Sequence, residues 1–274
     1  MDLGGTKMKL TQQRVDELNK LCHKFRRTLI DMLYKVQTGH PGGSLSCTEI
    51  ITTLYFEKMN VESDRFVLSK GHAAPMLYIN LANKGFFKLE DLDSLRQINC
   101  HLQGHPCKRK TPGVQISTGA LGLGLSAGLG LSLSDRLNQK DNYTYVLIGD
   151  GEIQEGAIWE AAMSAYKFKA DHLIAILDLN GVQLDGTTEE IMPMGNVADK
   201  WTAFGWNVIH ADGHNIADFA DAIDKAKENR GTPTIIIAKT VKGKGISFME
   251  GKNAWHGKPI GEEEYKQAIN ELGA

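Results

Sequence analysis

Two oxygen-bearing side chains follow apolar runs in this sequence and could hold a divalent metal ion. Asp150 lies between two glycines directly after the run Tyr145–Ile148, and Asn180 ends the run LIAILDLN thirty residues later. If both runs are parallel strands, both side chains reach the carboxyl edge of one sheet, where ligands bind in open α/β folds. Such oxygens suit Mg²⁺ held against a diphosphate, and the flanking glycines would let the backbone approach phosphate groups. The alternative is structural: Asp150 caps a turn and Asn180 accommodates a left-handed bend.

Three of the nine histidines, His40, His72 and His105, lie on bends bounded by glycine. An imidazole can take up and return protons near neutral pH, so histidines gathered at one site could act on substrate hydroxyl and carbonyl groups. Any one of them alone would more often be a surface or core residue. Three on similar bends favour the functional interpretation.

Alternating strand-like and helical segments would position these residues. β-rich runs predict strands at 65–68, 143–148, 173–179, 206–211 and 234–240, and apolar periodicity predicts helices at 15–36, 73–83, 156–168 and 216–229. Strands separated by helices form βαβ units and a mostly parallel sheet. We therefore predict an α/β fold, with a mostly parallel sheet flanked by helices on both faces, in one domain over residues 1–274.

Two local patterns concern the starts of further helices. Ser46, with Glu49 three residues later, has the spacing of a capping box and predicts a helix that continues through Phe56. The glycine-rich stretch 117–134 is either a helix whose glycines allow close packing, or a loop at 119–121 that admits a flat ligand and is followed by such a helix. A dinucleotide fingerprint is disfavoured, because no clear strand precedes this stretch and no acidic residue follows at the right distance.

Composition excludes several classes of function. The chain has 31 basic and 33 acidic residues and a net charge of −2, so nothing points to nucleic acid or an anionic membrane as partner. Its four cysteines form no disulfide ladder and suit a reducing compartment. The first 15 residues lack a signal-peptide stretch, and no run approaches the length of a membrane span. We expect a soluble cytoplasmic protein.

Four possible zinc ligands lie within eight residues, at Cys100, His101, His105 and Cys107. Their spacing fits no usual paired-ligand pattern, and three basic residues follow directly. Structural zinc is therefore disfavoured, and His105 is better assigned to a substrate.

Several segments together resemble the transketolases. The run GDGEIQEG with Asn180 resembles the thiamine diphosphate motif of this family. Further matches occur in family order and cover nearly the whole chain: TGHPGGSLS (38–46), RFVLSKGHAAPMLY (65–78), QGHP (103–106), STGALGLGLS (117–126), KTVKGKG (239–245) and AWHGKP (254–259). The chain is identified as a member of the transketolase-like enzymes, which implies the diphosphate-binding (PP-type) fold of thiamine diphosphate enzymes.

The resemblance also implies a ligand set. Mg²⁺, for which Ca²⁺ or Mn²⁺ can substitute, would be bound by Asp150, Asn180 and the carbonyl of Val182. The sequence departs from the commonest family pattern at Gly43 and Leu179, but neither change removes a metal ligand. The implied contacts of thiamine diphosphate are His72, Gly119, Ala120, Leu121, Asp150, Gly151, Glu152, Asn180, Lys242 and His256.

The activity implied by the resemblance is transfer of a two-carbon ketol unit from a ketose phosphate of the xylulose 5-phosphate type to an aldose phosphate of the ribose 5-phosphate type. His40, His72, His105 and His256 match the histidines that surround the reactive thiazolium carbon. Glu155 matches a carboxylate at the subunit interface, near the glutamate that activates the cofactor. The thiazolium would stabilise the carbanion, and the histidines would move protons.

The resemblance covers only the first part of a full transketolase, which continues into a pyrimidine-binding domain and a C-terminal domain. We therefore expect the N-terminal subunit of a split enzyme, requiring a separate C-terminal transketolase subunit in an α2β2 assembly. Exposed apolar surface should drive that association.

Other functions are possible on the same residues. A specialised split ketolase for a branched or sulfonated sugar fits equally, because much of the substrate-phosphate site would lie in the other chain. A deoxyxylulose phosphate synthase is disfavoured by GHPGG and SKGHAAP, which resemble transketolase instead. A non-catalytic thiamine diphosphate-binding regulatory subunit is disfavoured, since it would not need the histidines and Glu155.

Overall fold

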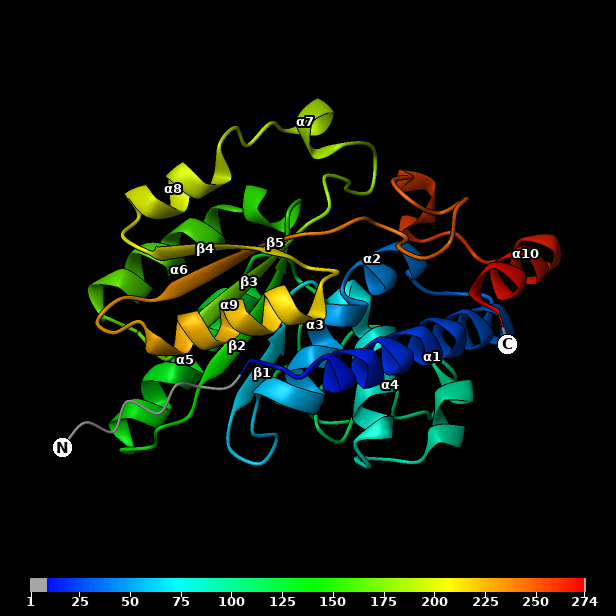
Figure 1. The fold of residues 1–274 in the computed structure, drawn as a ribbon, viewed down its shortest axis with the longest axis horizontal. Coiled ribbons are helices and arrows are strands. Elements are labelled where there is room, and N and C mark those ends of the chain that lie inside the picture. Colours follow the sequence, from blue (N-terminus) through cyan, green and yellow to red (C-terminus); the bar gives the residue numbers. More distant parts are fainter. Residues whose placement is uncertain (1–8, 274) are drawn as a thin grey trace.

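Five parallel strands form one sheet at the centre of the computed structural model, which describes residues 9–273 (Figure 1). Their spatial order is β1-β2-β3-β5-β4, so the last two strands are exchanged relative to the chain. The strands are β1 (Arg65–Leu68), β2 (Thr144–Gly149), β3 (Leu173–Leu179), β5 (Thr234–Lys239) and β4 (Asn207–Asp212). The predicted α/β class and all five strands are confirmed.

The central strands read as continuous apolar runs because both faces of the sheet are covered. Successive residues belong to opposite cores: Leu147 packs in the cluster on one face, and Ile148 packs in the cluster on the other. In β3 the same alternation separates Ile176 from Leu177. Every residue of β2 is buried, as a strand between two helical layers requires.

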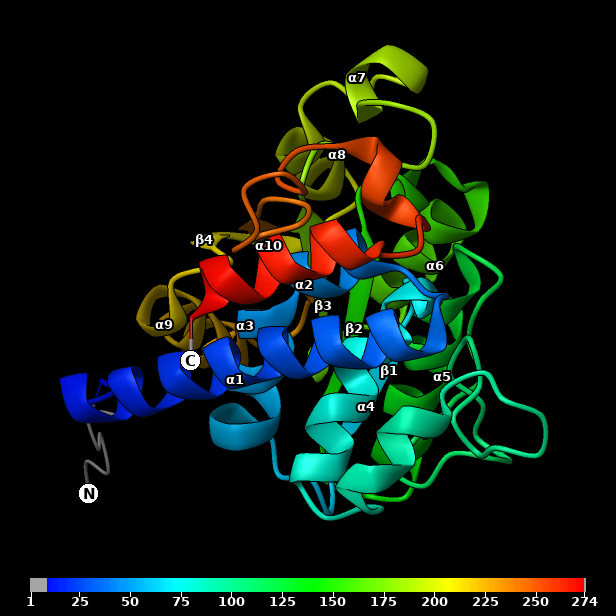
Figure 2. The same cartoon turned by 90° about the vertical axis from the view of Figure 1, so that its right-hand side faces the viewer.

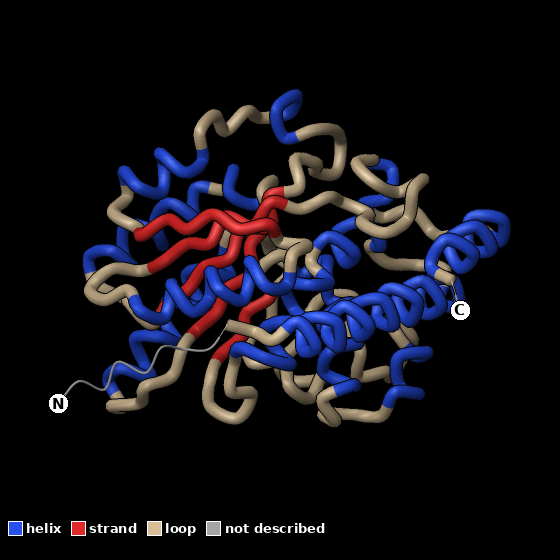
Figure 3. The backbone as a smooth tube through the Cα atoms, in the orientation of Figure 1, coloured by secondary structure: helices blue, strands red, loops and turns tan. Residues whose placement is uncertain are grey.

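Helices cover both faces, as Figures 2 and 3 show. The larger core contains residues of α1 (Gln12–Val36), α3 (Thr48–Thr53), α4 (Ala74–Asn83), α9 (Ile216–Glu228) and α10 (Glu262–Leu272). The smaller core contains residues of α5 (Leu123–Leu137), α6 (Gly156–Lys167) and α8 (Val197–Ala203). Two short helices complete the main set, α2 (Pro41–Ser46) and α7 (Thr188–Ile191).

Helix α1 begins and ends close to the predicted residues. The Thr11 hydroxyl accepts the amide hydrogen of Arg14 at 3.3 Å and caps the first turn. The helix ends at Val36, and Gln37 has a left-handed conformation with φ 51°. Pro41 then opens α2, because its fixed φ and missing amide hydrogen suit a first helical position.

The predicted capping box at Ser46 and Glu49 is wrong. Ser46 is the last residue of α2, and the backbone turns at Cys47 before α3 starts. The Ser46 hydroxyl donates to Asp178 at 2.6 Å, and Glu49 pairs with Arg26, with Nη1 and Oε1 2.6 Å apart. Both polar side chains are therefore used in tertiary contacts, which local spacing does not reveal.

The glycine-rich stretch contains a loop followed by a closely packed helix, while the predicted approach of a ligand to the loop stays a prediction. A loop runs to Gly122, and α5 follows from Leu123. A Cβ on Gly124 would lie 2.2 Å from Ser69 Oγ, and one on Gly128 would lie 2.3 Å from Val146 Cγ2. These glycines therefore allow α5 to pack closely against the strands.

Helix α10 was not predicted from its polar sequence. It lies beside α1 in Figure 2, where the rings of Tyr265 and Tyr34 stack with centroids 4.1 Å apart. Within residues 9–273, no helix is long and apolar enough to cross a lipid bilayer.

Candidate functional site

Asp150 and Asn180 lie at the same edge of the sheet, as predicted. Asp150 follows β2 and Asn180 follows β3, and these strands pair with Gly149 opposite Asp178. The Asp150 carboxylate accepts amide hydrogens from Gly151, at 2.8 Å, and from Gly181, which follows Asn180. A hydrogen bond therefore joins the loop after β2 to the loop after β3.

Asp150 is a buried carboxylate that has no cationic partner among residues 9–273. Its side chain is 4% exposed, and no Lys, Arg or His of the described chain forms an ion pair with it. Burial, followed by the nearby carboxylate of Asp178, raises the pKa of Asp150 to about 6. A divalent cation would compensate this charge, so the oxygen set of Asp150, Asn180 and the Val182 carbonyl fits Mg²⁺.

Lys242 is a buried cation that has no acidic partner among residues 9–273. Its ammonium donates to the carbonyls of Val182 at 3.0 Å and Gln183 at 3.3 Å, and no carboxylate among residues 9–273 pairs with it. Burial and the charge of Lys70 lower the pKa of Lys242 to about 8. A buried cation that contacts only neutral acceptors fits an anion such as a diphosphate.

Both residues line one cavity of about 260 Å³. The predicted site residues that line it are His72, Leu121, Asp150, Gly151, Glu152, Glu155, Asn180, Val182, Lys242 and His256. The fold thus brings together residues that are spread from position 72 to position 256. His40, His105, Gly119 and Ala120 do not line this cavity.

Four histidine rings nevertheless form one cluster that extends from the cavity. The ring centroid of His40 lies 5.6 Å from that of His72, 5.5 Å from His256 and 6.1 Å from His105. The rings of His72 and His256 are 4.8 Å apart. The expectation that these histidines gather is therefore met, while their catalytic role stays a prediction.

The hydrogen bond from Lys242 assigns the proton on His256. Lys242 Nζ lies 2.9 Å from His256 Nδ1, and an ammonium can only donate. Nδ1 is thus the acceptor, and a neutral ring must carry its hydrogen on Nε2. Burial, followed by the charge of Lys242, lowers the pKa of His256 to about 3, so the ring is neutral at pH 7.

The other three histidines are also biased toward the neutral form. Burial and the charge of Arg96 lower the pKa of His40 to about 4. Burial lowers the pKa of His72 well below its usual value, and it also lowers the pKa of His105. A cluster of neutral imidazoles can both donate and accept hydrogen bonds, which suits contact with hydroxyl and carbonyl groups.

The two predicted glutamates have different surroundings. Glu152 is 2% exposed, and its carboxylate accepts amide hydrogens from Gly122 at 2.9 Å and Gly149 at 3.0 Å, as well as the Ser69 hydroxyl. It therefore joins the glycine-rich loop to the end of β2. Glu155 is exposed at the cavity, where a partner could reach it.

The glycine-rich loop supplies backbone beside the histidines. Gly119 has φ +143°, and a Cβ there would lie 3.3 Å from the His105 ring. Ala120 and Leu121 are exposed. The departure at Gly43 also has a steric reason, because a Cβ there would come within 2.9 Å of the His72 ring.

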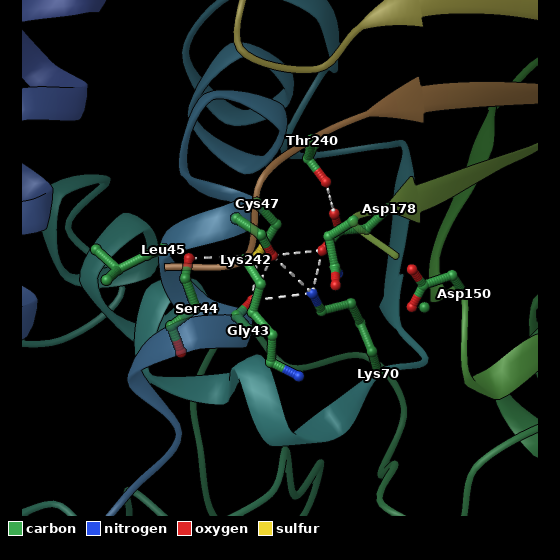
Figure 4. Close-up of polar contacts among 12 residues, drawn as sticks. Gly43, Ser44, Leu45, Cys47, Lys70, Asp150, Asp178, Thr240 and Lys242 are labelled. Atoms are coloured by element: carbon green, nitrogen blue, oxygen red, sulfur yellow. Dashed lines mark hydrogen bonds and ion pairs between the residues drawn. The ribbon is translucent and has the colours of Figure 1, made fainter. Parts of the chain in front are cut away.

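A buried ion pair beneath the cavity, Lys70 with Asp178, was not predicted from the sequence (Figure 4). Lys70 is 1% exposed and Asp178 is fully buried. A charged residue inside the apolar run LIAILDLN was the available signal, since carboxylates are rarely buried without a partner. Lys70 lies in the segment RFVLSKGHAAPMLY, which contributes to the family resemblance, but its type and spacing alone indicated no role.

A second unpredicted network holds the segment that carries Lys242. The amide hydrogen of Val241 is donated to His214 Nε2 at 2.8 Å, and Arg26 donates to the carbonyl of Lys244 at 3.0 Å. Glu49 joins the two, because it accepts from His214 Nδ1 at 2.9 Å and from Arg26. Lys242 is thereby held from both sides.

The possible zinc ligands are engaged separately. His101 Nε2 contacts Asp91 at 3.2 Å, and Cys100 Sγ accepts the amide hydrogen of Leu102 at 3.0 Å. In the part of the chain that is described, no three His, Cys, Asp or Glu side chains form a metal-binding group. His105 instead faces the histidine cluster.

A larger cavity of about 940 Å³ lies near the ends of β4 and β5. Its lining includes polar residues of both charges, such as His210, Asp212, Asp218 and Lys239, and Asp150 is the one predicted site residue among them. This mixed lining favours no single ligand class. The smaller cavity, with its unpaired acid and unpaired lysine, is the candidate site.

Comparison with known proteins identifies a family. The family "Transketolase, thiamine diphosphate binding domain" matches residues 18–274. The chain is 44% identical to the 6-deoxy-6-sulfo-D-fructose transketolase subunit SqwG of Clostridium sp. (strain MSTE9), over 96% of this chain and 98% of that protein. It is 41% identical to an apulose-4-phosphate transketolase subunit of Phocaeicola vulgatus, over 94% and 95% of the two chains.

Longer proteins match over part of their length. Human transketolase is 38% identical over 95% of this chain, which spans 43% of the human protein. The crystal structure of transketolase from Campylobacter jejuni superposes with a TM-score of 0.88 at 33% identity, over 96% of this chain and 43% of that chain. The chain thus spans less than half of these transketolases, and nearly all of the two proteins named as subunits.

Proposed function

This chain belongs to the transketolase family, as its thiamine diphosphate-binding part, and from that premise we propose that it is the N-terminal subunit of a heteromeric transketolase. The single observation that carries the proposal is the pair of opposite, unpaired charges in one cavity, Asp150 and Lys242. A metal diphosphate would satisfy both. In this proposal, Mg²⁺ is held by Asp150, Asn180 and the Val182 carbonyl.

Lys242 and the backbone at Gly151 would hold the diphosphate. The Val182 carbonyl has two lone pairs, so it can accept from Lys242 and still face a metal ion. Gly151 adjoins the ligand and lacks a side chain, and a Cβ there would lie 3.0 Å from Gln183. The start of α6 after this loop adds the positive end of a helix dipole.

When bound, thiamine diphosphate supplies the carbanion stabilisation that no side chain can provide. The contribution of this chain is to orient the sugar and to handle protons on its oxygens. His256 presents an Nε2–H donor because Lys242 occupies Nδ1. His40, His72 and His105 would donate to, or accept from, neighbouring hydroxyl and carbonyl oxygens as neutral rings.

A separate C-terminal subunit would complete the site, in an assembly of two copies of each chain. The near-complete coverage of two relatives named as subunits supports this arrangement. Exposed apolar side chains on α5 and α6, Leu123, Met163 and Tyr166, together with Leu121, offer surface for association. Glu155 lies against Gly122, which stands between Leu121 and Leu123.

Two substrate classes are compatible with the site. The first is transfer from a xylulose 5-phosphate type of ketose to a ribose 5-phosphate type of aldose. The second is a specialised ketolase for a sulfonated or branched sugar, which is favoured by the similarity to proteins named for 6-deoxy-6-sulfo-D-fructose and apulose 4-phosphate. Both use the same chemistry and the same residues of this chain.

The test is the rate of ketol transfer by this chain with thiamine diphosphate and Mg²⁺, alone and mixed with the protein encoded by the neighbouring gene as a candidate C-terminal subunit. Xylulose 5-phosphate, 6-deoxy-6-sulfo-D-fructose and apulose 4-phosphate serve as donors, with ribose 5-phosphate and glyceraldehyde 3-phosphate as acceptors. Activity in the mixture alone would support the split enzyme, and the preferred donor would decide between the two classes. Cofactor binding without transfer from any donor would favour a regulatory subunit.

A further inference from the structure

One carboxylate beneath the cavity gathers side chains from three other segments. Asp178 of β3 accepts the Ser46 hydroxyl of α2 at 2.6 Å, the Thr240 hydroxyl that follows β5, and the Lys70 ammonium that follows β1. Figure 4 shows Lys70 and Thr240 directed at this carboxylate. Four separate chain segments therefore meet at Asp178.

Lys70 reaches Asp178 across an intervening strand, because β2 lies between β1 and β3. The residue of β2 opposite Asp178 is Gly149, and a Cβ there would lie 3.7 Å from Lys70 Cβ and 4.0 Å from Lys70 Cδ. The lysine side chain thus passes directly against a residue that has no side chain of its own. The ion pair connects the ends of two strands that do not pair with each other.

The ammonium of Lys70 is neutralised by Asp178 within the protein. It carries three N–H groups. They are directed to Asp178, to the Gly43 carbonyl at 2.9 Å and to Ser46 Oγ at 3.3 Å. Although Lys70 lines the cavity, its charge is used within the protein, in contrast to that of Lys242.

Three residues of this polar network, Lys70, Asp178 and Thr240, each lie two positions before a residue of the candidate site. His72 follows Lys70, Asn180 follows Asp178 and Lys242 follows Thr240. The fourth residue of the network, Ser46, is the last residue of α2, and His40 directly precedes the first residue of that helix. A displacement at Asp178 would therefore shift a predicted metal ligand, a diphosphate contact and a histidine together.

We propose that the buried Lys70–Asp178 pair, with Ser46 and Thr240, positions the cofactor-binding segments relative to one another. This inference rests on the proposed function, since it assumes that those segments bind a metal diphosphate. In this role Lys70 and Asp178 are positioning residues, which act through the segments that they hold together. Stability alone does not demand them, because a buried ion pair can often be replaced by apolar residues of similar volume without loss of stability.

The experiment measures cofactor affinity and stability separately. Thiamine diphosphate is titrated calorimetrically, in the presence of Mg²⁺, into this chain combined with its C-terminal subunit. The decisive variant is the double substitution Lys70→Met and Asp178→Leu, which removes both charges and leaves neither one unpaired. We expect it to melt near the wild-type temperature but to bind the cofactor about 10- to 100-fold more weakly, the scale seen when outer partners of metal ligands are lost.

A matched control is the ion pair of Lys58 and Asp224, whose Nζ and Oδ2 atoms are 2.6 Å apart and which lies outside the cavity lining. The substitutions Lys58→Met and Asp224→Leu should leave affinity within about twofold of wild type. If the Lys70–Asp178 double variant does not fold, Asp178→Asn preserves the shape of the side chain and should still weaken binding severalfold.

Wild-type affinity in a stable double variant, or in a stable Asp178→Asn variant, would overturn the positioning role while leaving the proposed function intact. If the wild-type complex itself failed to bind thiamine diphosphate with Mg²⁺, the proposed function would fall and the positioning role with it. The wild-type titration therefore separates the two failures.

Discussion

Lys242 Nζ lies 2.9 Å from His256 Nδ1, so the lysine determines which nitrogen of the histidine presents a hydrogen to the cavity. The same ammonium contacts the Val182 carbonyl, which is a predicted metal ligand. One buried cation thus connects the predicted cofactor site to the histidine cluster. Its removal would affect both binding and the orientation of the imidazole.

If His256 acts on the sugar, His256→Ala should slow ketol transfer in the assembled enzyme by at least about tenfold, because a positioned donor or proton carrier is lost. The half-buried ring leaves the core intact, so the melting temperature should change little. His23→Ala, on the exposed face of α1, is the control and should retain the wild-type rate. An undiminished rate for His256→Ala would assign this residue to structure.

Asp150→Asn should abolish Mg²⁺-dependent retention of thiamine diphosphate. The amide keeps the shape of the side chain but removes the charge that a divalent ion requires. The measurement is calorimetric titration with and without Mg²⁺, together with a circular dichroism spectrum that should match wild type. Asp185→Asn, an exposed acid near the cavity, is the control. Unchanged affinity for Asp150→Asn would refute its assignment as a metal ligand.

Two glycines of α5 should respond in opposite directions to the same substitution. A Cβ on Gly128 would lie 2.3 Å from Val146 Cγ2, so Gly128→Ala should lower the free energy of unfolding by about 1–3 kcal/mol through overpacking. Nothing lies within 4 Å of a Cβ on Gly130, so Gly130→Ala should raise that free energy by up to about 1 kcal/mol. Urea denaturation of the chain measures both. Equal effects would contradict the packing described for α5.

The pair of Glu49 and Arg26 should contribute stability that depends on pH. Burial alone would raise the pKa of Glu49, but the hydrogen bond from His214 and the charge of Arg26 outweigh it and lower that pKa. A carboxyl group with a depressed pKa in the folded state stabilises the fold above its unfolded pKa, about 4.3, and this contribution is lost as the pH falls through the folded pKa.

Glu49→Gln should therefore lower the free energy of unfolding by about 3 kcal/mol at pH 7, because Arg26 is left buried without its partner. The difference from wild type should shrink progressively below about pH 4. Chemical denaturation at pH 7, 5 and 3.5 tests this. Glu62→Gln, an exposed site, should show no such dependence. A difference that stayed constant with pH would contradict the assignment.

Strands and long helices were predictable because burial leaves a periodic signal in the chain. The runs at 144–149 and 173–179 are apolar throughout most of their length since helices cover both faces of the sheet. Helix α10 was not predicted because most of its residues are polar or charged. Its few apolar residues pack against other elements, as Tyr265 does on Tyr34 of α1, and the local sequence does not show these contacts. The predicted capping box was wrong because Ser46 and Glu49 contact residues that are distant in sequence, Asp178 and Arg26 respectively.

By itself, the sequence predicted Asp150 and Asn180 at one edge of a parallel sheet, because apolar strands separated by a helical segment are typical of parallel βαβ units, and the strand pairing confirms this placement. Only the tertiary structure decided that Lys70 crosses β2 to reach Asp178, and that Arg26, Glu49 and His214 hold the segment that carries Lys242. Ion pairs between distant segments depend on how elements pack. Sequence spacing records local geometry and contains little of that packing.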